Sequence, residues 1–473
     1  MANWTLKELE LWDARIRDKA EAFGLQLFPQ EFEIYDHNEM LGAMAYSGMP
    51  SHYPHWSYGK GFEKLKTMYD YGVSGLPYEM VINSNPSLAY LMRDNTLLLQ
   101  ILTIAHVYGH NDFFRNNFTF KSTRPDYVLG SFKAHALRVR SYMEDPSIGV
   151  DRVERILDAA HALSLQCRRN LAVKKLSASA ERERLLVAAK PRQDPYASLH
   201  ARASYSEPDL HKNPPSPEED LLLFIRDANP FLAGWERDLL TIVHEETQYF
   251  IPQIETKIIN EGWASFWHRE ILNSLELPQD LQLEFLVRHN QVVRPVPGGL
   301  NPYHLGLKLW DDIRRRFCGG APEQEGGGPE GGETFDKLFE VRASERDASF
   351  LRRFLTEDLL RELDLFEYRS RGDEKVISEV ADDEGWEQVK ATLIKGVGMG
   401  SVPVIKVEEA GYGRHGALYL KHDHDDRDLH LDYAERTLAY VHRLWGKEVL
   451  LETVIEGRRL TLSFGDRGFS VKR

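Results

Sequence analysis

Apolar residues recur every three or four positions through most of the first two thirds of the chain, which is the spacing of one face of an α-helix. In the first such segment a rough stripe consists of Leu6, Leu9, Leu11, Ile16, Ala20 and Phe23. The same spacing predicts helices over residues 6–24, 30–46, 95–111, 130–143, 151–171, 218–225, 234–250, 256–273 and 280–289. This large N-terminal part is therefore predicted to be helical.

The pattern changes after a glycine-rich stretch, "CGGAPEQEGGGPEGGE". Short β-like runs follow and predict strands at 363–370, 375–380, 402–409, 416–422, 448–457 and 458–465. Helical spacing returns only at 385–396 and 433–446. We therefore expect a mainly α protein, made of a helical domain (1–317), a linker (318–333) and a small α+β domain (334–473). A proline-rich stretch at 190–217 is predicted to be an insertion in the helical domain.

Composition and charge narrow the class of protein. The chain has 473 residues, 42% of them hydrophobic, and a formal net charge of −14. This charge argues against nucleic acid as the main partner. The two cysteines, Cys167 and Cys318, allow neither a disulfide framework nor a cysteine zinc site. Because the N-terminus lacks a signal core and the longest apolar run is too short for a bilayer, we expect a cytoplasmic protein without membrane insertion.

Candidate chemistry begins with "IAHVYGHNDFF", which follows an apolar segment and places His106 and His110 four residues apart. On a helix this spacing puts the two imidazoles about 40° apart and one turn along, so they can share one zinc ion. The glutamate of an H-E-x-x-H motif is missing between them. A pair of hydrogen-bonded core histidines explains the pattern equally simply.

Two further segments carry residues of the same chemical type. "TIVHEETQYF" reads H-E-x-x-Q, with His244 and Gln248 on one helix face and Glu245 placed for general-base work. "NEGWASFWH" puts Glu261 and His268 on one stripe of the next predicted helix. By themselves His244, Glu245 and Gln248 fit a charged, solvated helix face.

Together the three segments suggest a buried cluster. Each lies on a helix of the same predicted domain, flanked by apolar and aromatic residues. Buried His and Glu side chains without partners are costly, so they should satisfy one another directly or through a metal. A divalent metal, most plausibly Zn²⁺, and a purely structural polar network both remain open. A histidine- and aromatic-rich loop at 51–62 is expected to fold against the same region.

Several long strings resemble the SpoVR family (stage V sporulation protein R). They are "GMPSHYPHWSYGKGFEK", "INSNPSLAYLM", "AHVYGHNDFFRNN", "TKIINEGWASFWH" and "NPYHLG". The resemblance covers nearly the whole chain. It implies a cytoplasmic bacterial protein involved in formation of the spore cortex, a peptidoglycan layer, or in stress responses where no spores form. It implies no particular biochemical activity.

Two hypotheses of function follow. In the first, the protein is a metal-dependent hydrolase of an amide or peptide bond, with a cell-wall precursor as the candidate substrate. The metal ligands would be His106, His110, Glu261 and His244, with Glu245 as base and His268 beside them or acting on the transition state. The substrate cleft would be lined by His52, His55, Trp56 and Tyr58. In the second, the protein is a regulatory scaffold without enzymatic activity, and its α+β tail binds a partner protein.

Overall fold

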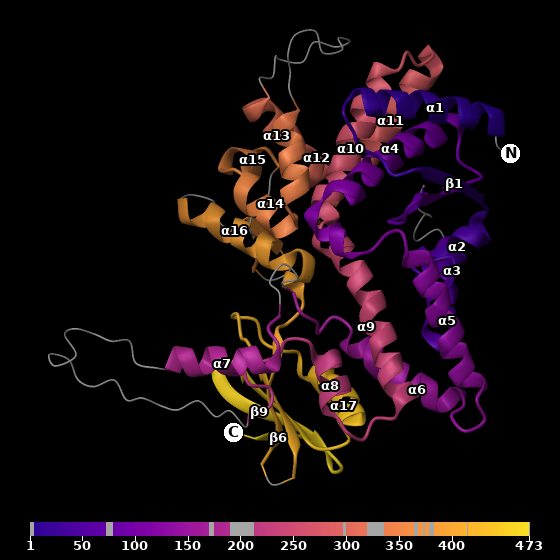
Figure 1. Ribbon diagram of the computed structural model, residues 1–473. Helices are drawn as coiled ribbons and strands as arrows, with labels where there is room; N and C mark the ends of the chain where they lie inside the picture. The colour runs from indigo at the N-terminus through magenta and orange to yellow at the C-terminus, as the bar shows by residue number, and fades with distance from the viewer. Residues whose placement is uncertain are drawn as a thin grey trace. The chain divides into compact units, whose positions relative to one another are not determined.

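A computed structural model describes residues 4–71, 79–169, 175–189, 212–296, 299–318, 335–363, 368–371, 374–377, 383–413 and 415–472 (Figure 1). The chain divides into two compact units. Unit 1 comprises Met1–Arg140 and Gln248–Ser401, and unit 2 comprises Ser141–Thr247 and Val402–Arg473. Among the described residues, no helix combines the length and the apolar character that a bilayer span requires.

Unit 1 is mainly helical, as predicted. Its helices are α1 (Leu6–Ala22), α2 (His37–Ala45), α3 (Trp56–Asp70), α4 (Leu97–Asn116), α10 (Lys257–Ser274), α11 (Gln279–Val292), α12 (Pro302–Phe317), α13 (Asp336–Ser344), α14 (Asp347–Phe354), α15 (Glu357–Glu362) and α16 (Asp383–Gly396). Two helices, α5 (Val128–Glu144) and α9 (Gly234–Glu255), contain residues of both units. The centre of unit 1 is α4, which packs against α1, α10 and α11, while α10 also packs against α12.

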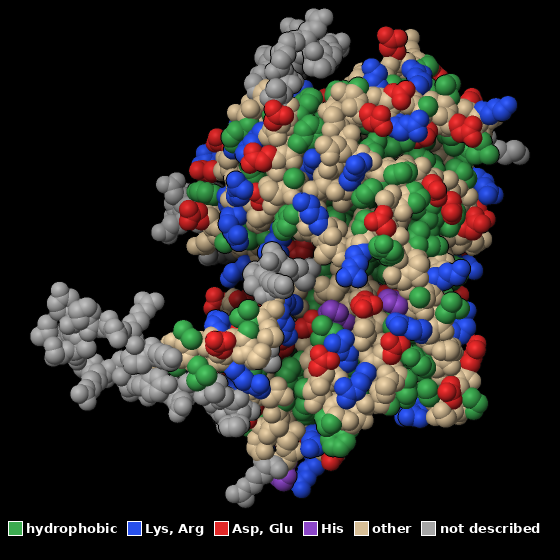
Figure 2. Space-filling model, viewed as in Figure 1, with side chains coloured by type: hydrophobic (Ala, Val, Ile, Leu, Met, Phe, Trp, Pro, Cys, Tyr) green, Lys and Arg blue, Asp and Glu red, His purple; other side chains and the backbone are tan. Residues whose placement is uncertain are grey.

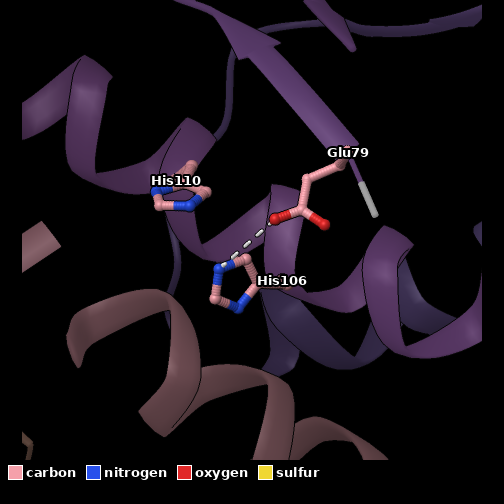
Figure 3. A group of neighbouring side chains, drawn as sticks. All are labelled: Glu79, His106 and His110. Atoms are coloured by element: carbon pink, nitrogen blue, oxygen red, sulfur yellow. Dashed lines mark ion pairs between the residues drawn. The ribbon is translucent and has the colours of Figure 1, made fainter. Parts of the chain in front are cut away.

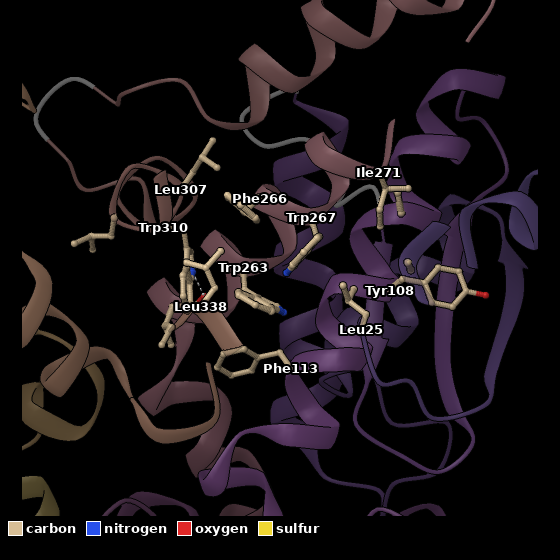
Figure 4. Close-up of a cluster of buried hydrophobic side chains, with 14 of the residues drawn as sticks. Leu25, Tyr108, Phe113, Trp263, Phe266, Trp267, Ile271, Leu307, Trp310 and Leu338 are labelled. Carbon is tan, nitrogen blue, oxygen red and sulfur yellow. Dashed lines mark hydrogen bonds between the residues drawn. The ribbon is translucent and has the colours of Figure 1, made fainter. Parts of the chain in front are cut away.

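The core of unit 1 is unusually aromatic. Trp263 and Trp267 on α10 and Trp310 on α12 are fully buried, and the ring centroids of Trp263 and Trp310 lie 4.7 Å apart (Figure 4). Side chains from α1, α4, α13 and α14 complete the same cluster. Burial of this apolar surface stabilises the helices that carry the candidate chemistry.

A buried ion pair crosses this core. The carboxylate of Asp112 on α4 accepts two hydrogen bonds from Arg342 Nη1, at 2.6 and 2.7 Å. It also accepts one from Trp263 Nε1 at 2.9 Å and one from the Gln26 backbone N–H at 2.8 Å. Because every partner comes from a different part of the sequence, the pair fixes α4 relative to α10 and α13.

A small sheet lies beside these helices, and part of it corrects the sequence analysis. Its strands are β1 (Gln30–Tyr35), β2 (Glu79–Ile82) and β3 (Ser87–Met92), in the order β1-β3-β2, with β3 parallel to β1 and antiparallel to β2. The predicted helix at 30–46 is therefore wrong in its first half. Residues 30–35 alternate, so Phe32 and Ile34 pack on the core, and Asp36 then caps α2.

Unit 2 contains the predicted α+β tail. The strands β6 (Ile405–Tyr412), β7 (Ala417–His422), β8 (Val449–Ile455), β9 (Arg458–Gly465) and β10 (Gly468–Lys472) form one sheet in the order β10-β9-β8-β7-β6. Only the pair β7–β8 is parallel, and the helix α17 (Leu431–Trp445) connects these two strands. The other helices of unit 2 are α6 (Val150–Leu163), α7 (Ala178–Ala189) and α8 (Leu221–Ala228). The strand β10 had no counterpart in the sequence analysis.

The two units do not follow the order of the chain. Helices α13–α16 come after the glycine-rich stretch but belong to unit 1, whereas residues 141–247 belong with the C-terminal sheet. The predicted strands at 363–370 and 375–380 are present as the hairpin β4 (Tyr368–Arg371) and β5 (Glu374–Ile377). Most of the predicted linker at 318–333 and of the insertion at 190–217 lies outside the described residues, so those two assignments stay predictions.

Candidate metal centre

The helix α4 carries two histidines into the interior of unit 1. Thr96 caps its N-terminus by accepting a hydrogen bond from the Leu99 N–H, and every residue from Leu98 to Phe114 is buried. His106 and His110 lie one turn apart in the middle of this helix, with ring centroids 4.7 Å apart. Both predicted histidines are thus buried polar groups that need partners.

Glycines bring α10 close enough to provide one partner. A Cβ on Gly109 would lie 2.6 Å from the Ala264 Cα, and a Cβ on Gly262 would lie 2.4 Å from the Gly306 backbone. No larger side chain fits at these two contacts without moving backbone. The close approach sets Glu261 Oε2 at 3.4 Å from His110 Nε2 and at 3.6 Å from His106 Nε2.

A second carboxylate comes from β2. Glu79, the first residue of this strand, points toward both imidazoles (Figure 3), and its Oε1 lies 3.9 Å from His106 Nε2. One donor atom each from Glu79, His106 and His110 lie within 4.8 Å of one another. Glu79 was missed in the sequence because a single glutamate before a short strand carries no spacing relation to the α4 histidines.

The far nitrogens of both imidazoles are held by hydrogen bonds. His110 Nδ1 lies 2.9 Å from Asn260 Oδ1, so it must carry a proton to donate, which leaves the Nε2 lone pair facing Glu261. His106 Nδ1 lies 2.9 Å from His268 Nδ1. Ligand histidines in metalloproteins are usually oriented in this manner through their second nitrogen.

His268 continues this contact into a row of three imidazoles. Its Nε2 lies 2.7 Å from Nδ1 of His289 on α11. Burial holds the pKa of His268 well below its ordinary value and lowers the pKa of His289 to about 4, so both rings are neutral at pH 7. A proton on His106 Nδ1 that is donated along this row leaves the His106 Nε2 lone pair directed at the carboxylates.

The row predicts a pH dependence of stability. The pKa of His289 is about 4 in the folded protein and 6.5 ordinarily, so the unfolded chain binds the proton more tightly. The contribution of neutral His289 to the free energy of unfolding should be fully present above pH 6.5. It should be lost as the pH drops toward 4, which lowers the free energy of unfolding by on the order of 3 kcal/mol. His289→Gln should flatten this slope in urea unfolding measured from pH 7.5 to 4.5, whereas His37→Gln, at an exposed site, should not. An unchanged slope in His289→Gln would contradict the assignment.

The electrostatics of the cluster call for a positive charge at its centre. Burial raises the pKa of Glu79. Although burial opposes ionisation of Glu261 too, the two imidazoles hold its pKa below the ordinary value. Burial of the His110 ring favours the neutral form, yet its contact with Glu261 raises the His110 pKa. A proton or a metal cation between nitrogen and carboxylate satisfies both groups.

The distances fit a metal better than a hydrogen bond. Separations of 3.4–3.9 Å between nitrogen and oxygen exceed those of N–H···O hydrogen bonds, about 2.7–3.2 Å. Zinc bonds of about 2.0–2.2 Å in a tetrahedral arrangement place neighbouring ligand atoms about 3.3–3.6 Å apart. The two Glu261 separations, 3.4 and 3.6 Å, match this spacing, whereas Glu79 is farther away, at 3.9 Å. Moreover, the buried atoms His106 Nε2 and Glu261 Oε2 have no hydrogen-bond partner within the described ranges. The residues present therefore fit a divalent cation.

His244 and Glu245 belong to unit 2. There His244 Nε2 lies 2.8 Å from Asp220 Oδ2, and Asp220 also caps α8. Their predicted roles as fourth ligand and base stay predictions. We build the centre from unit 1 alone, with His106, His110 and Glu261 as the candidate ligands and Glu79 beside them.

The predicted aromatic loop turns out to be partly helical, because His55 caps α3, which begins at Trp56. The phenol of Tyr58 lies 3.0 Å from His52 Nε2, and the His52 ring also packs against Phe132. Trp56 is 51% exposed. The substrate-lining role of His52, His55, Trp56 and Tyr58 stays a prediction.

Unit 1 is thus a helical body around a buried two-histidine, two-carboxylate cluster, and an α+β domain ends the chain. Comparison with known proteins identifies this class. The family model "SpoVR like protein" matches residues 3–402, and "SpoVR-like C-terminal domain" matches residues 403–456. The chain belongs to the SpoVR family. The boundary between the two matches falls where the last segment of unit 2 begins.

A curated relative extends over nearly the same length. The chain is similar to "Uncharacterized protein YcgB" of Escherichia coli (strain K12), with 33% identity over 473 residues, covering 95% of this chain and 92% of that protein. No solved structure matches the chain. The resemblance noted in the sequence is thereby confirmed at the level of the family.

Proposed function

We propose that the protein is a metal-dependent hydrolase of an amide or peptide bond. The observation that carries this proposal is the convergence of the His106 and His110 Nε2 atoms and the Glu79 and Glu261 carboxylates, at spacings that suit a shared cation. The side chains of Glu79 and Glu261 are 14% and 18% exposed, so the two residues are not completely sealed from solvent.

Each residue has a definite role in this proposal. His106, His110 and Glu261 hold the cation, and Asn260 and His268 orient the two imidazoles. A bound Zn²⁺ would lower the pKa of a water molecule and polarise the substrate carbonyl. Glu79, whose pKa is raised by burial, would act as the general base toward the attacking water and as the general acid toward the leaving amine.

The family supports a substrate class for this proposal. Its description as SpoVR-like, with the link of that family to the spore cortex, supports a peptide or amide bond of a peptidoglycan precursor. The Glu261 ligand and the neighbouring Glu79 carboxylate together offset the charge of a divalent cation, so the centre as a whole is close to neutral. Such a centre suits an uncharged amide group.

The test is hydrolysis of soluble muropeptides by zinc-loaded protein, followed by mass spectrometry of the new termini. Glu79→Gln should retain the metal and lose about 10²–10⁴-fold in rate, because only the proton transfer is removed. Glu276→Gln, an exposed change in the same unit, should leave the rate unchanged. A metal-loaded wild-type protein that generates no new termini from muropeptides would exclude this activity, and would leave the metal site itself to be judged by metal analysis.

A further inference from the structure

The sheet of unit 2 has two edges of different character. At the β6 edge the chain itself supplies a partner, since Glu218 and Val407 exchange backbone hydrogen bonds of 3.0 and 2.8 Å. The Asn213 carbonyl also accepts the Ala410 N–H, at 2.6 Å. At the other edge β10 pairs with β9, and no further strand lies beyond it in the described part of the chain. An edge strand offers a row of N–H and C=O groups to an incoming strand.

The β10 edge is also basic, in a chain of net charge −14. Residues 458–472 contain four cationic side chains and one acidic side chain, and all five are exposed. Of the cations, Arg458, Arg459 and Arg467 have no ion-pair partner among the residues that the structure describes. On the face shown in Figure 2, basic and acidic side chains are interspersed. Unpaired positive charge at an open edge favours an acidic partner.

The two faces of β10 differ in chemistry. Phe469 and Val471 lie opposite Phe464 and Leu462, on the face covered by α17, where the rings of Phe464 and His442 lie 5.6 Å apart. Val471 remains 47% exposed. Strand alternation puts Ser470 and Lys472 on the other face, together with Arg459 of β9. A strand added here would meet apolar groups on one face and cations on the other.

We propose that β10 is the docking site for an extended acidic segment of a partner protein, which adds to the sheet as a sixth strand. The segment would alternate apolar residues, placed beside Phe469 and Val471, with glutamates or aspartates, placed near Lys472 and Arg459. Backbone hydrogen bonds give such strand addition its affinity, and the alternating side chains give specificity. A second copy of β10 is a poor occupant, because it would bring like charges together.

The experiment uses the full chain and two fluorescein-labelled peptides of alternating sequence, one of glutamate and valine and one of lysine and valine. Fluorescence anisotropy should show the glutamate peptide binding at least about tenfold more tightly, by an amount that shrinks as salt is added. The double variant Arg467→Glu, Lys472→Glu should lose at least about tenfold in affinity. The matched control Lys64→Glu, Lys66→Glu, exposed on α3, should bind like wild type. Hydrogen exchange should slow at residues 468–472 in the wild-type complex.

The wild-type chain provides a second test that needs no substitution. Methylation of alternate backbone nitrogens in the glutamate peptide should abolish binding, because strand pairing requires those N–H groups. Equal affinity of the methylated peptide, or protection elsewhere in the chain, overturns the proposal. If the wild-type protein has the mass of a dimer in solution and the Arg467→Glu, Lys472→Glu variant has the mass of a monomer, the occupant of this edge is a second copy of the chain. Binding of phosphatidylglycerol vesicles through these residues, without peptide binding, would make it a lipid surface. Both results overturn the proposal as well.

Discussion

Replacing His110 with Ala is expected to release a divalent metal from the protein. The wild-type chain should carry about one metal ion, most plausibly zinc given imidazole and carboxylate donors. Because a ligand that binds only the folded state stabilises it, loss of the metal should lower the free energy of unfolding by about 4 kcal/mol where the metal is at 1,000 times its Kd. Elemental analysis gives the metal content, and thermal unfolding with and without EDTA gives the stability.

The matched control is His135→Ala, which removes another buried histidine of unit 1. This variant should lose stability while keeping its metal, and EDTA should still destabilise it. In His110→Ala, by contrast, EDTA should have no further effect. A wild-type protein that is metal-free and takes up no zinc, manganese or ferrous iron would refute the metal centre. The hypothesis of a regulatory scaffold without enzymatic activity would then be the better supported one.

Replacing Arg342 with Met should destabilise unit 1 by about 3–5 kcal/mol, since Asp112 would be left as a buried charge without its counter-ion. The two Arg342 bonds to Asp112 lie in the core, between helices that come together only in the folded chain. Urea unfolding followed by tryptophan fluorescence measures the change, because Trp263 donates to the same carboxylate.

The control for this prediction is Arg352→Met, an exposed position on α14, which should change stability by less than about 0.5 kcal/mol. Asp112→Asn combined with Arg342→Met should recover part of the loss, because no uncompensated charge then remains. A cost below about 1 kcal/mol for Arg342→Met alone would show that water reaches Asp112, and that the pair does not fix α4.

Local spacing was sufficient to predict many elements. The helix predicted at 95–111 is α4. Its long apolar run and its N-terminal cap at Thr96 both favour a buried helix. The same holds for α10, and the alternating runs after residue 402 gave β6 to β9. The 30–46 segment failed because six residues of alternating pattern run straight into an amphipathic helix. When residues 30–46 are considered together, the helical spacing of the second half hides the alternating pattern of the first six residues.

Three members of the cluster were also within reach of the sequence. His106 and His110 share a face by their spacing alone, and Glu261 follows from its place on the next candidate helix. What the sequence could not give is the second carboxylate, because Glu79 reaches the histidines through the pairing of β2 with β3. Nor could it give His289, whose contact with His268 depends on the packing of α11 against α4.

The sequence by itself thus determined the helical character of unit 1, the α+β character of the tail and the pair of imidazoles, since these depend on residues within a few turns or strands of one another. Only the tertiary structure decided which carboxylates meet those imidazoles, which nitrogens are held by Asn260 and His268, and that residues 141–247 join the C-terminal sheet. Apart from the contact of Glu79 with His106, which joins positions much closer in the chain, those contacts connect positions 150 or more residues apart. The contacts of Glu261, Asn260 and His268 with the α4 histidines depend on the close approach of α4 and α10 at Gly109, and local periodicity carries no record of such long-range packing.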